Sequence, residues 1–389
     1  MARPARRGTA APAETGAPRI GSPSARLVAI ILPSNEGFSP EAVGAIGLMV
    51  QRLGTAQSAF RTVVVGATLR HPPFAAPAFH PVPLPRWLPV GRTAQYVQGI
   101  ASALQQLRPS LIEVHNRPLV ALALARRFPH TPTVLVLHND PQGMRGAASA
   151  AERGRLRTLA RVVVVSSYVR DRLVDGVAGW ISPPSVQPNC IDLAAMPPRL
   201  PPHSRDRLIL FAGRLVPEKG PDSFVEACAR SLPHLPGWRA EIIGARRLRP
   251  GSARDAYSRA VQRAAGAAGV CVAGHQPHAA VLAAMAGAAI VVAPSRWPEP
   301  FGLMALEAMA SEAALICSPY GNLAGLVGEA AVLADPDDLA ALSDAITQLG
   351  RDAPRRAALG RAGLERAQAF DIKLGVAALD RLRDEILGL

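Results

Sequence analysis

Short apolar runs alternate with longer amphipathic segments along almost the whole chain. The runs are bounded by Gly, Pro and polar residues, which is typical of buried parallel strands, whereas the Ala- and Leu-rich segments between them favour helices. This alternation predicts an α/β architecture. The expected strands lie at residues 26–32, 61–65, 111–115, 133–138 and 161–166, and then at 208–212, 239–243, 270–273, 289–293 and 314–318.

A Pro-rich stretch at residues 183–202 interrupts this rhythm and marks the expected domain boundary. A chain of 389 residues is longer than one typical domain, so we expect two similar α/β domains around a cleft. The predicted division is a disordered basic tail at 1–25, a first domain at 26–200, a second at 201–370 and a C-terminal helix at 371–389.

Two segments between the expected strands have a less regular pattern. Residues 71–92 contain seven Pro, and we expect them to form a long irregular loop. After the first strand, a loop at 33–38 precedes a helix that runs through Leu53, and the chain ends in helices from Leu339 onward.

The charge balance is strongly basic. The net charge is +14, from 43 Lys and Arg against 29 Asp and Glu, which suits a phosphate-bearing substrate or an anionic lipid surface. Aromatic residues make up only 4% and are not interleaved with basic ones, which disfavours nucleic acid as a partner. No apolar run is long enough for a membrane span and no secretory signal is evident, so we expect a cytoplasmic protein with possible peripheral membrane contact.

Several kinds of site are excluded or disfavoured. The four Cys are scattered without metal-ligand spacing, so we expect buried free thiols. No G-x-G-x-x-G motif follows the first strand and no Walker loop is present, which disfavours a nicotinamide dehydrogenase and a P-loop enzyme. The acidic run Asp335-Pro336-Asp337-Asp338 is interpreted as a helix cap, not as a metal site.

Two carboxylates bracket a predicted helix start after the strand at 289–293. Glu299 lies between two Pro and is expected to be extended, Gly302 then releases the backbone, and Glu307 lies about one turn inside the helix. The free N–H groups of such a helix start suit a phosphate, with a carboxylate on either side to hold hydroxyls. The alternative is that both are ordinary solvated glutamates.

Basic residues and histidines follow other expected strands. Arg214 and Lys219 lie in the loop after the strand at 208–212, where two cations could neutralise a diphosphate. Lys219 is one of only two Lys in the chain. The alternative is that Arg214 caps the strand and Lys219 pairs with its neighbour in sequence. His115 and His138 each end a strand of the first domain and could face the cleft or be structural.

Together these motifs resemble those of the retaining glycosyltransferases of the GT-B fold, family 4 (glycosyl transferases group 1). The matching segments are 162–168, 188–192, 211–220 and 299–307, in an order that extends over nearly the whole chain from about residue 26. The resemblance implies two Rossmann-like domains whose parallel sheets face a central cleft. The first domain would lie on the acceptor side, and the second would bind the nucleotide sugar.

The resemblance also implies roles for individual residues. Glu299 would bind hydroxyls of the donor sugar, Glu307 would hold the ribose, and Arg214 and Lys219 would bind the diphosphate. The expected catalytic residues are His138, Arg214, Lys219 and Glu299, and the expected donor-binding residues are Gly37, Gly213, Arg214, Lys219, Glu299, Phe301, Gly302, Leu303 and Glu307.

The implied activity moves a hexose from a UDP- or GDP-linked sugar to a glycan or lipid-linked acceptor with retention of configuration, in bacterial surface polysaccharide synthesis. No cofactor or metal is expected, because two cations take the metal's place. The chain departs from the family at Gly37-Phe38, where two glycines are common, and at Ser311-Glu312, where Cys-Gly is common, which leaves the donor open. The alternatives are a non-catalytic sugar-nucleotide or glycan-binding protein and a sugar-nucleotide epimerase.

Overall fold

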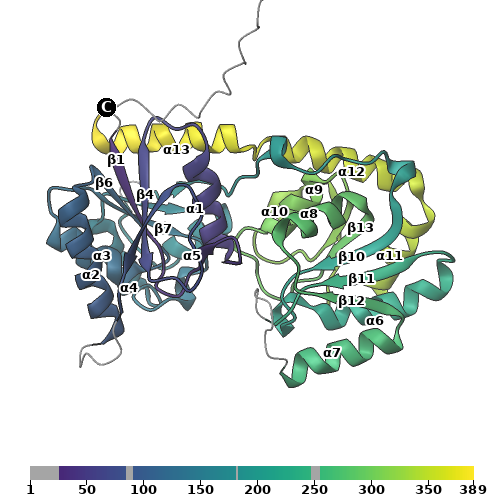
Figure 1. Cartoon of the computed structure of the whole chain (residues 1–389). Helices are drawn as coiled ribbons and strands as arrows, with labels where there is room; N and C mark the ends of the chain where they lie inside the picture. The colour runs from purple at the N-terminus through teal and green to yellow at the C-terminus, as the bar shows by residue number, and fades with distance from the viewer. Residues whose placement is uncertain (1–25, 85–90, 181–182, 247–254) are drawn as a thin grey trace, which may run out of the picture.

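A computed structural model describes residues 26–84, 91–180, 183–246 and 255–389. Within these ranges the chain forms two parallel sheets, each flanked by helices, that lie beside each other (Figure 1). The tail at 1–25 lies outside the described residues. We call the first sheet with its helices the first domain and the second sheet with its helices the second domain.

The first sheet has seven strands in the described part of the chain. In spatial order they are β5 (Ala78–Val82), β4 (Arg61–Ala67), β1 (Leu27–Ile31), β6 (Leu111–His115), β7 (Thr133–Leu137), β8 (Arg161–Val164) and β9 (Ser185–Val186). All neighbours in this sheet pair in parallel. The strand order reverses between β1 and β6, which is the doubly wound arrangement.

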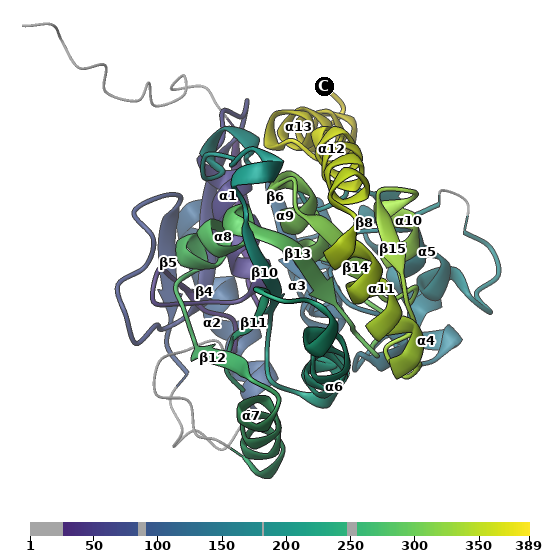
Figure 2. The same ribbon diagram turned by 90° about the vertical axis from the view of Figure 1, so that its right-hand side faces the viewer.

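The second sheet repeats this order with six described strands (Figure 2). They are β12 (Val270–Gly274), β11 (Arg239–Ile243), β10 (Asp206–Ala212), β13 (Ala288–Ala293), β14 (Ala314–Cys317) and β15 (Ala331–Leu333). The reversal now falls between β10 and β13. The expected pair of Rossmann-like sheets is therefore confirmed.

Both faces of each sheet are buried along central strands such as β1 and β13, which explains why these strands are continuous apolar runs in the sequence. Along β10, Leu208 and Leu210 face one core cluster, whereas Ile209 and Phe211 face another. In the same way, Ala29 and Ile31 of β1 belong to one core cluster, whereas Val28 and Ile30 belong to another on the opposite face of the sheet. Successive side chains of a strand point to opposite faces of the sheet, so one strand contributes to both clusters when helices cover both faces.

The helices fill the intervals between strands and continue past the last strand. In the first domain they are α1 (Ala45–Thr55), α2 (Arg92–Leu107), α3 (Pro118–Arg127), α4 (Ala150–Arg155) and α5 (Ser167–Val174). The others are α6 (Pro221–Ser231), α7 (Ala256–Ala267), α8 (His278–Gly287), α9 (Leu303–Ala310), α10 (Leu323–Val327), α11 (Leu339–Arg351), α12 (Ala353–Gln368) and α13 (Ile372–Leu387).

The last helix returns to the first domain. Figure 1 shows α13, in yellow, lying along the first sheet after α12 has left the second. Leu382 and Ile386 of α13 pack on the apolar cluster of β1. Arg383 donates two hydrogen bonds to Glu113 of β6, at 2.8 and 3.1 Å, and both side chains are buried. The end of the chain is thus fixed to the domain in which the chain begins.

Three predictions about local structure need correction. Residues 71–92 are not wholly irregular, because β5 lies within them; Pro81 fits there since β5 is an edge strand. Residues 85–90 of that segment lie outside the described residues. A small antiparallel hairpin, β2 (Phe38–Ser39) with β3 (Ala42–Val43), precedes α1 where we expected helix. Of the four Cys, Cys271 is exposed, while the others are buried as expected.

In the described residues, each helix is too short or too polar to cross a membrane.

Candidate functional site

The candidate site lies where the order of the second sheet reverses. β10 and β13 are parallel neighbours, so the loops after their carboxyl ends, 213–220 and 294–302, emerge side by side. Ligands of doubly wound sheets bind in the crevice at such a reversal. The arrangement also faces the other domain: Ser166, which follows β8, donates a hydrogen bond to the carbonyl of Pro300.

A Lys–Glu–Ser cluster joins these two loops. Lys219 Nζ donates to Glu299 Oε1, and Ser295 Oγ lies 2.8 Å from the same oxygen. The Lys219 side chain is 29% exposed and that of Glu299 15%, so a ligand can reach both. Lys219 pairs across the site with Glu299, and not with its neighbour Glu218, which was the alternative interpretation of the sequence.

Two glycines allow the loops to approach this closely. Gly220 has φ +64°, and a Cβ there would lie 2.0 Å from the carbonyl oxygen of Pro294. Gly321 has φ +65°, and its Cβ would lie 2.4 Å from both N and O of Glu299. Glu299 also forms a parallel bridge with Gly321, which holds it extended as expected. The backbone around Glu299 is therefore fixed from two sides.

The helix start after Glu299 is open. Gly302, at φ +99°, precedes α9, and no side chain caps the helix. Phe301 is buried edge-on against Phe370, with ring centroids 5.9 Å apart, and Asn322 Nδ2 donates to the Phe301 carbonyl at 3.0 Å. Leu303 packs against the small apolar cluster that includes Met49 of the first domain. The N–H groups of the first turn remain available to an anion.

Glu307 lies one turn inside α9, as expected, but it is not free. Its Oε1 accepts from Arg52 Nη2 at 3.0 Å and contacts His278 Nε2 at 2.8 Å. Burial favours a raised pKa for Glu307, but the hydrogen bond and charge of His278 and Arg52 outweigh it and lower the pKa. The carboxylate is therefore ionised at neutral pH.

Gly213 and Arg214 begin the loop after β10. Gly213 donates its N–H to the carbonyl of Ile243, and a Cβ on the adjoining Gly244 would lie 1.7 Å from the Gly213 carbonyl oxygen. Arg214 is exposed, and within the described ranges its side chain makes no hydrogen bond or ion pair. It is thus a cation available to a ligand, and it does not cap the strand.

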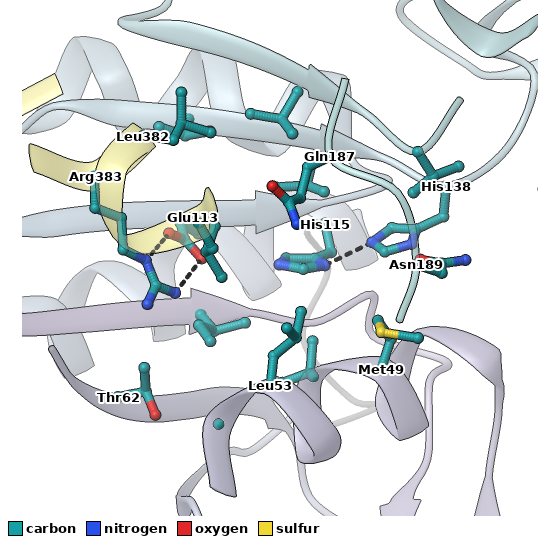
Figure 3. A pocket seen from close by; sticks show the side chains of 18 of the residues that line it. Met49, Leu53, Thr62, Glu113, His115, His138, Gln187, Asn189, Leu382 and Arg383 are labelled. Carbon is teal, nitrogen blue, oxygen red and sulfur yellow. Dashed lines mark hydrogen bonds and ion pairs between the residues drawn. The ribbon is translucent and has the colours of Figure 1, made fainter. Parts of the chain in front are cut away.

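His138 lies in the first domain, at the end of β7. Its Nε2 is 2.8 Å from His115 Nδ1, and its backbone N–H donates to Asn116 Oδ1 at 2.7 Å (Figure 3). Burial lowers the pKa of both histidines, that of His115 to about 3, so both are neutral. His115 Nε2 is buried without a partner among the described residues. Because an orphaned N–H is rarer than an orphaned acceptor, this favours a proton on Nδ1 of each ring.

The two histidines line a cavity of ≈ 40 Å³ between the first sheet, α1 and α13 (Figure 3). Its lining is mostly apolar and includes Met49 and Leu53, with the Glu113–Arg383 pair at one end. This space is far too small for a nucleotide sugar, which needs a pocket of several hundred Å³. The cavity is therefore a packing gap between the first sheet, α1 and α13, and not the site itself.

Gly37 lies in the turn before the β2–β3 hairpin. A Cβ there would lie 2.0 Å from the Ala42 carbonyl oxygen, so the hairpin itself requires glycine. The adjacent Glu36 accepts from the Gly47 N–H at 3.0 Å, and burial raises its pKa. No hydrogen bond or ion pair among the described residues joins Gly37 or His138 to the cluster of Lys219, so their roles stay predictions.

Three functional candidates were missed in the sequence: Ser295, Arg52 and His278. Ser295 lies next to Pro294 in the same sequence motif, but a single Ser does not indicate a function by itself. Arg52 and His278 are brought to Glu307 by α1 and α8, from 255 and 29 residues away in sequence. Only tertiary packing shows these two contacts.

The acidic run before α11 is a cap, as predicted. Asp338 accepts from the Ala341 N–H at 2.9 Å, and Asp337 pairs with Arg296 at 2.6 Å. Across the described part of the chain, no group of three or more His, Cys, Asp or Glu is placed to hold a metal ion.

Two family profiles match consecutive parts of the chain. "Glycosyltransferase Family 4" matches residues 49–195, and "Glycosyl transferases group 1" matches residues 195–366. A glycogen synthase of Mycobacterium tuberculosis is 30% identical over 277 residues, which is 65% of this chain and 64% of that protein's length. A D-inositol 3-phosphate glycosyltransferase of an Arthrobacter strain is 32% identical over 48% of this chain and 46% of its own length.

Solved structures share the two-sheet architecture. A sucrose-phosphate synthase from Thermosynechococcus elongatus has a TM-score of 0.76 at 19% identity, covering 93% of this chain and 99% of that one. HepE from Anabaena, in complex with UDP and glucose, has a TM-score of 0.73 at 18% identity, covering 92% and 100%. At these identities the likeness establishes the fold.

Proposed function

Since the chain belongs to the group 1 and family 4 glycosyltransferases and has their GT-B fold, we propose that it transfers a hexose from a nucleoside-diphosphate sugar to an acceptor hydroxyl with retention of configuration. The observation that carries the proposal is the cluster of Lys219, Glu299 and Ser295 beside the open start of α9. A cation, a carboxylate and an uncapped helix start lie together at the carboxyl ends of adjacent strands, which suits a sugar linked to a diphosphate.

Each part of the cluster suits one part of the donor. Lys219 and Arg214 would bind the diphosphate together with the first turn of α9, and Glu299 would accept from hydroxyls of the sugar. In the structure Lys219 and Glu299 satisfy one another, so donor binding exchanges their mutual ion pair for contacts to the ligand. An ammonium on a flexible stem suits this exchange better than a planar guanidinium.

The reaction proposed here needs no protein nucleophile. The bond between the anomeric carbon and the diphosphate oxygen breaks, and the electron pair leaves with the nucleoside diphosphate. The acceptor oxygen forms its bond to the same face, and its proton passes to the departing diphosphate. Arg214, Lys219 and the α9 dipole stabilise the negative charge that develops on the leaving group. His138 would contact the donor sugar from the first domain.

The similar proteins narrow the first substrates to test. One structural neighbour holds UDP and glucose, and the glycogen synthase is named for a polysaccharide product. These support a UDP-linked hexose as donor and a glycan as acceptor. The lipid-linked acceptor and the role in surface polysaccharide synthesis are proposed from the family resemblance alone.

The decisive experiment follows release of nucleoside diphosphate from UDP-, GDP- and ADP-linked hexoses, with and without a panel of glycan and lipid-linked acceptors. A glycosyltransferase releases nucleoside diphosphate and yields a new α- or β-linked product whose anomeric configuration matches the donor. A non-catalytic binding protein would bind nucleotide and release nothing. An epimerase would convert the donor without any acceptor, and either result would replace our proposal.

The only other Lys in the sequence offers a matched control. We expect Lys219→Ala to lower kcat about 100-fold or more, the magnitude seen when one charge-stabilising donor is removed. Lys373→Ala, on the exposed face of α13, should retain wild-type kcat and KM. Equal kinetics in the two variants would contradict the assignment of Lys219 to the diphosphate.

We propose that turnover needs no divalent ion, since Arg214 and Lys219 occupy the metal's role toward the diphosphate. Activity should be unchanged after exhaustive treatment with a chelator. An absolute requirement for Mg²⁺ or Mn²⁺, restored by adding the ion back, would refute this.

A further inference from the structure

One arginine of the first domain reaches a carboxylate of the second. Arg52 lies near the end of α1, and its Nη2 donates to Glu307 Oε1 in α9 at 3.0 Å. Its Nη1 donates to the Cys190 carbonyl at 3.4 Å, which holds the guanidinium from the other side. The side chains of Arg52 and Glu307 are 11% and 7% exposed, so this ion pair is shielded from solvent.

Oε1 of Glu307 also contacts a second side chain, that of His278. His278 Nε2 lies 2.8 Å from Oε1, which requires a proton on Nε2. The 3.5 Å approach of Arg52 Nη2 to His278 Nε2 is then a contact between two donors and not a hydrogen bond. Arg52 and His278 therefore converge on Oε1. In the described residues, Oε2 accepts no hydrogen bond, so its lone pairs remain available.

A carboxylate held by one oxygen is also fixed in orientation. Two donors on Oε1, from different helices, restrict rotation of the carboxylate plane and determine where Oε2 points. His278 alone could pivot with Glu307, because α8 and α9 belong to the same domain and pack together. Arg52 is the contact that relates this orientation to the first domain.

We propose that Arg52 is a positioning residue, supplied by the first domain, that sets Oε2 of Glu307 for the ribose hydroxyls of the donor. Ribose recognition then requires both domains in contact, although Glu307 lies in only one of them. This inference rests on the proposed function, because it assumes that the second domain binds a nucleoside diphosphate.

The test compares two nucleotides that differ only in the ribose hydroxyls. Affinities for UDP and for 2′,3′-dideoxy-UDP are measured by calorimetry in the wild type, Arg52→Met, Arg52→Lys and Glu307→Gln, with GDP, ADP and their dideoxy analogues run in parallel. We expect Arg52→Met to weaken binding of the ribonucleotide about tenfold and binding of the dideoxynucleotide less than about twofold, because only the former uses Glu307. Arg52→Lys should fall between Arg52→Met and the wild type.

Two further variants make the result specific. In the double variant Arg52→Met/Glu307→Gln, the ribonucleotide should bind no more weakly than in Glu307→Gln, since residues that act through one contact are not additive. Arg161→Met removes another first-domain arginine, one that pairs with Glu385 of α13 at 3.7 Å, and should leave both affinities unchanged.

The outcomes separate the possible failures. Equal weakening of both nucleotides by Arg52→Met means that Arg52 only supports the fold, and unchanged affinities mean that it does not act on the ribose; either overturns the inference alone. A wild-type protein that binds none of UDP, GDP and ADP overturns the proposed function, and the inference with it.

Discussion

At Gly321 the chain passes so close to Glu299 that a side chain has no room. The φ of +65° and the 2.4 Å approach of a Cβ to two backbone atoms of Glu299 act together, since the first disfavours any L-residue and the second is a clash with backbone. A substitution there must move the loop that carries Glu299. The position of the carboxylate that we propose for donor binding thus depends on a residue with no side chain.

We therefore expect Gly321→Ala to lower the melting temperature and to reduce donor turnover. Expressed as free energies, the loss of turnover should be at least as large as the loss of stability. The steric and conformational costs together amount to about 1–3 kcal/mol. Gly266→Ala is the matched control, because Gly266 lies in exposed α7 with nothing within 4 Å of its Cβ. Helix propensity makes that change neutral or stabilising. Calorimetric unfolding and donor turnover measure both effects, and a Gly321→Ala variant with wild-type melting and turnover would contradict this account.

Among the elements, α13 is notable because its position against the first domain could not be predicted from the sequence pattern. Its apolar face contacts the first sheet, and Arg383 of α13 pairs with Glu113, a charged residue inside a fully buried strand. Neither charge is tolerable alone in that environment, because both side chains are almost completely buried. The contact fixes the C-terminus of the chain against the first domain.

Arg383→Met should destabilise the protein by about 3–5 kcal/mol, since it leaves the Glu113 carboxylate buried without its partner. Arg230→Met breaks the exposed i,i+4 pair with Glu226 and should cost less than about 1 kcal/mol. Denaturant unfolding monitored by circular dichroism distinguishes the two. Similar midpoints for both variants would show that the buried pair carries no special weight.

The sequence was most informative where burial alone determines structure. Strands β13 and β14 matched the expected ranges to within one residue, because parallel strands with two covered faces are uninterrupted apolar runs. The strands that were missed, β5, β9 and β15, are short or contain Pro, and the β2–β3 hairpin lacks a distinctive turn sequence.

One part of the candidate site could be predicted from the sequence and another part could not. The contiguous motif from Glu299 to Glu307 could be predicted because the Pro, Gly and helix-forming residues around it determine the local backbone. The partners of those carboxylates could not, because Lys219, Arg52 and His278 reach them only through the packing of separate elements. In the structure both carboxylates are already paired with cations, which spacing in the sequence does not reveal.

At the scale of the whole molecule, the dominant property is charge. A net charge of +14 on one chain produces a field that attracts any anionic surface, independently of the donor site. Each basic residue near an anionic membrane contributes about 1 kcal/mol, and the attraction falls off within a Debye length. A lipid-linked acceptor would be met most readily by a protein already held at such a surface.

We predict binding to vesicles that contain phosphatidylglycerol and no binding to vesicles of phosphatidylcholine alone, measured by co-sedimentation. Raising the salt to about 0.5 M should release the protein, because exposed charges are screened at that ionic strength. Binding that is equal on both vesicle types, or unaffected by salt, would contradict an electrostatic origin.

The ion pair of Lys219 with Glu299 has a consequence for covalent chemistry. Acylating reagents attack the neutral amine of lysine, and this sequence contains only two lysines among its 43 basic residues. Limited acylation followed by mass spectrometry of the peptides should therefore report on the site almost without background. Lys373 is exposed and should react readily, whereas the Lys219 side chain is only 29% exposed and its Nζ contacts Glu299, so it should react slowly. UDP should protect Lys219 further while Lys373 continues to react, so the ratio of two labelled peptides would give the occupancy of the site in a mixture as complex as a cell extract.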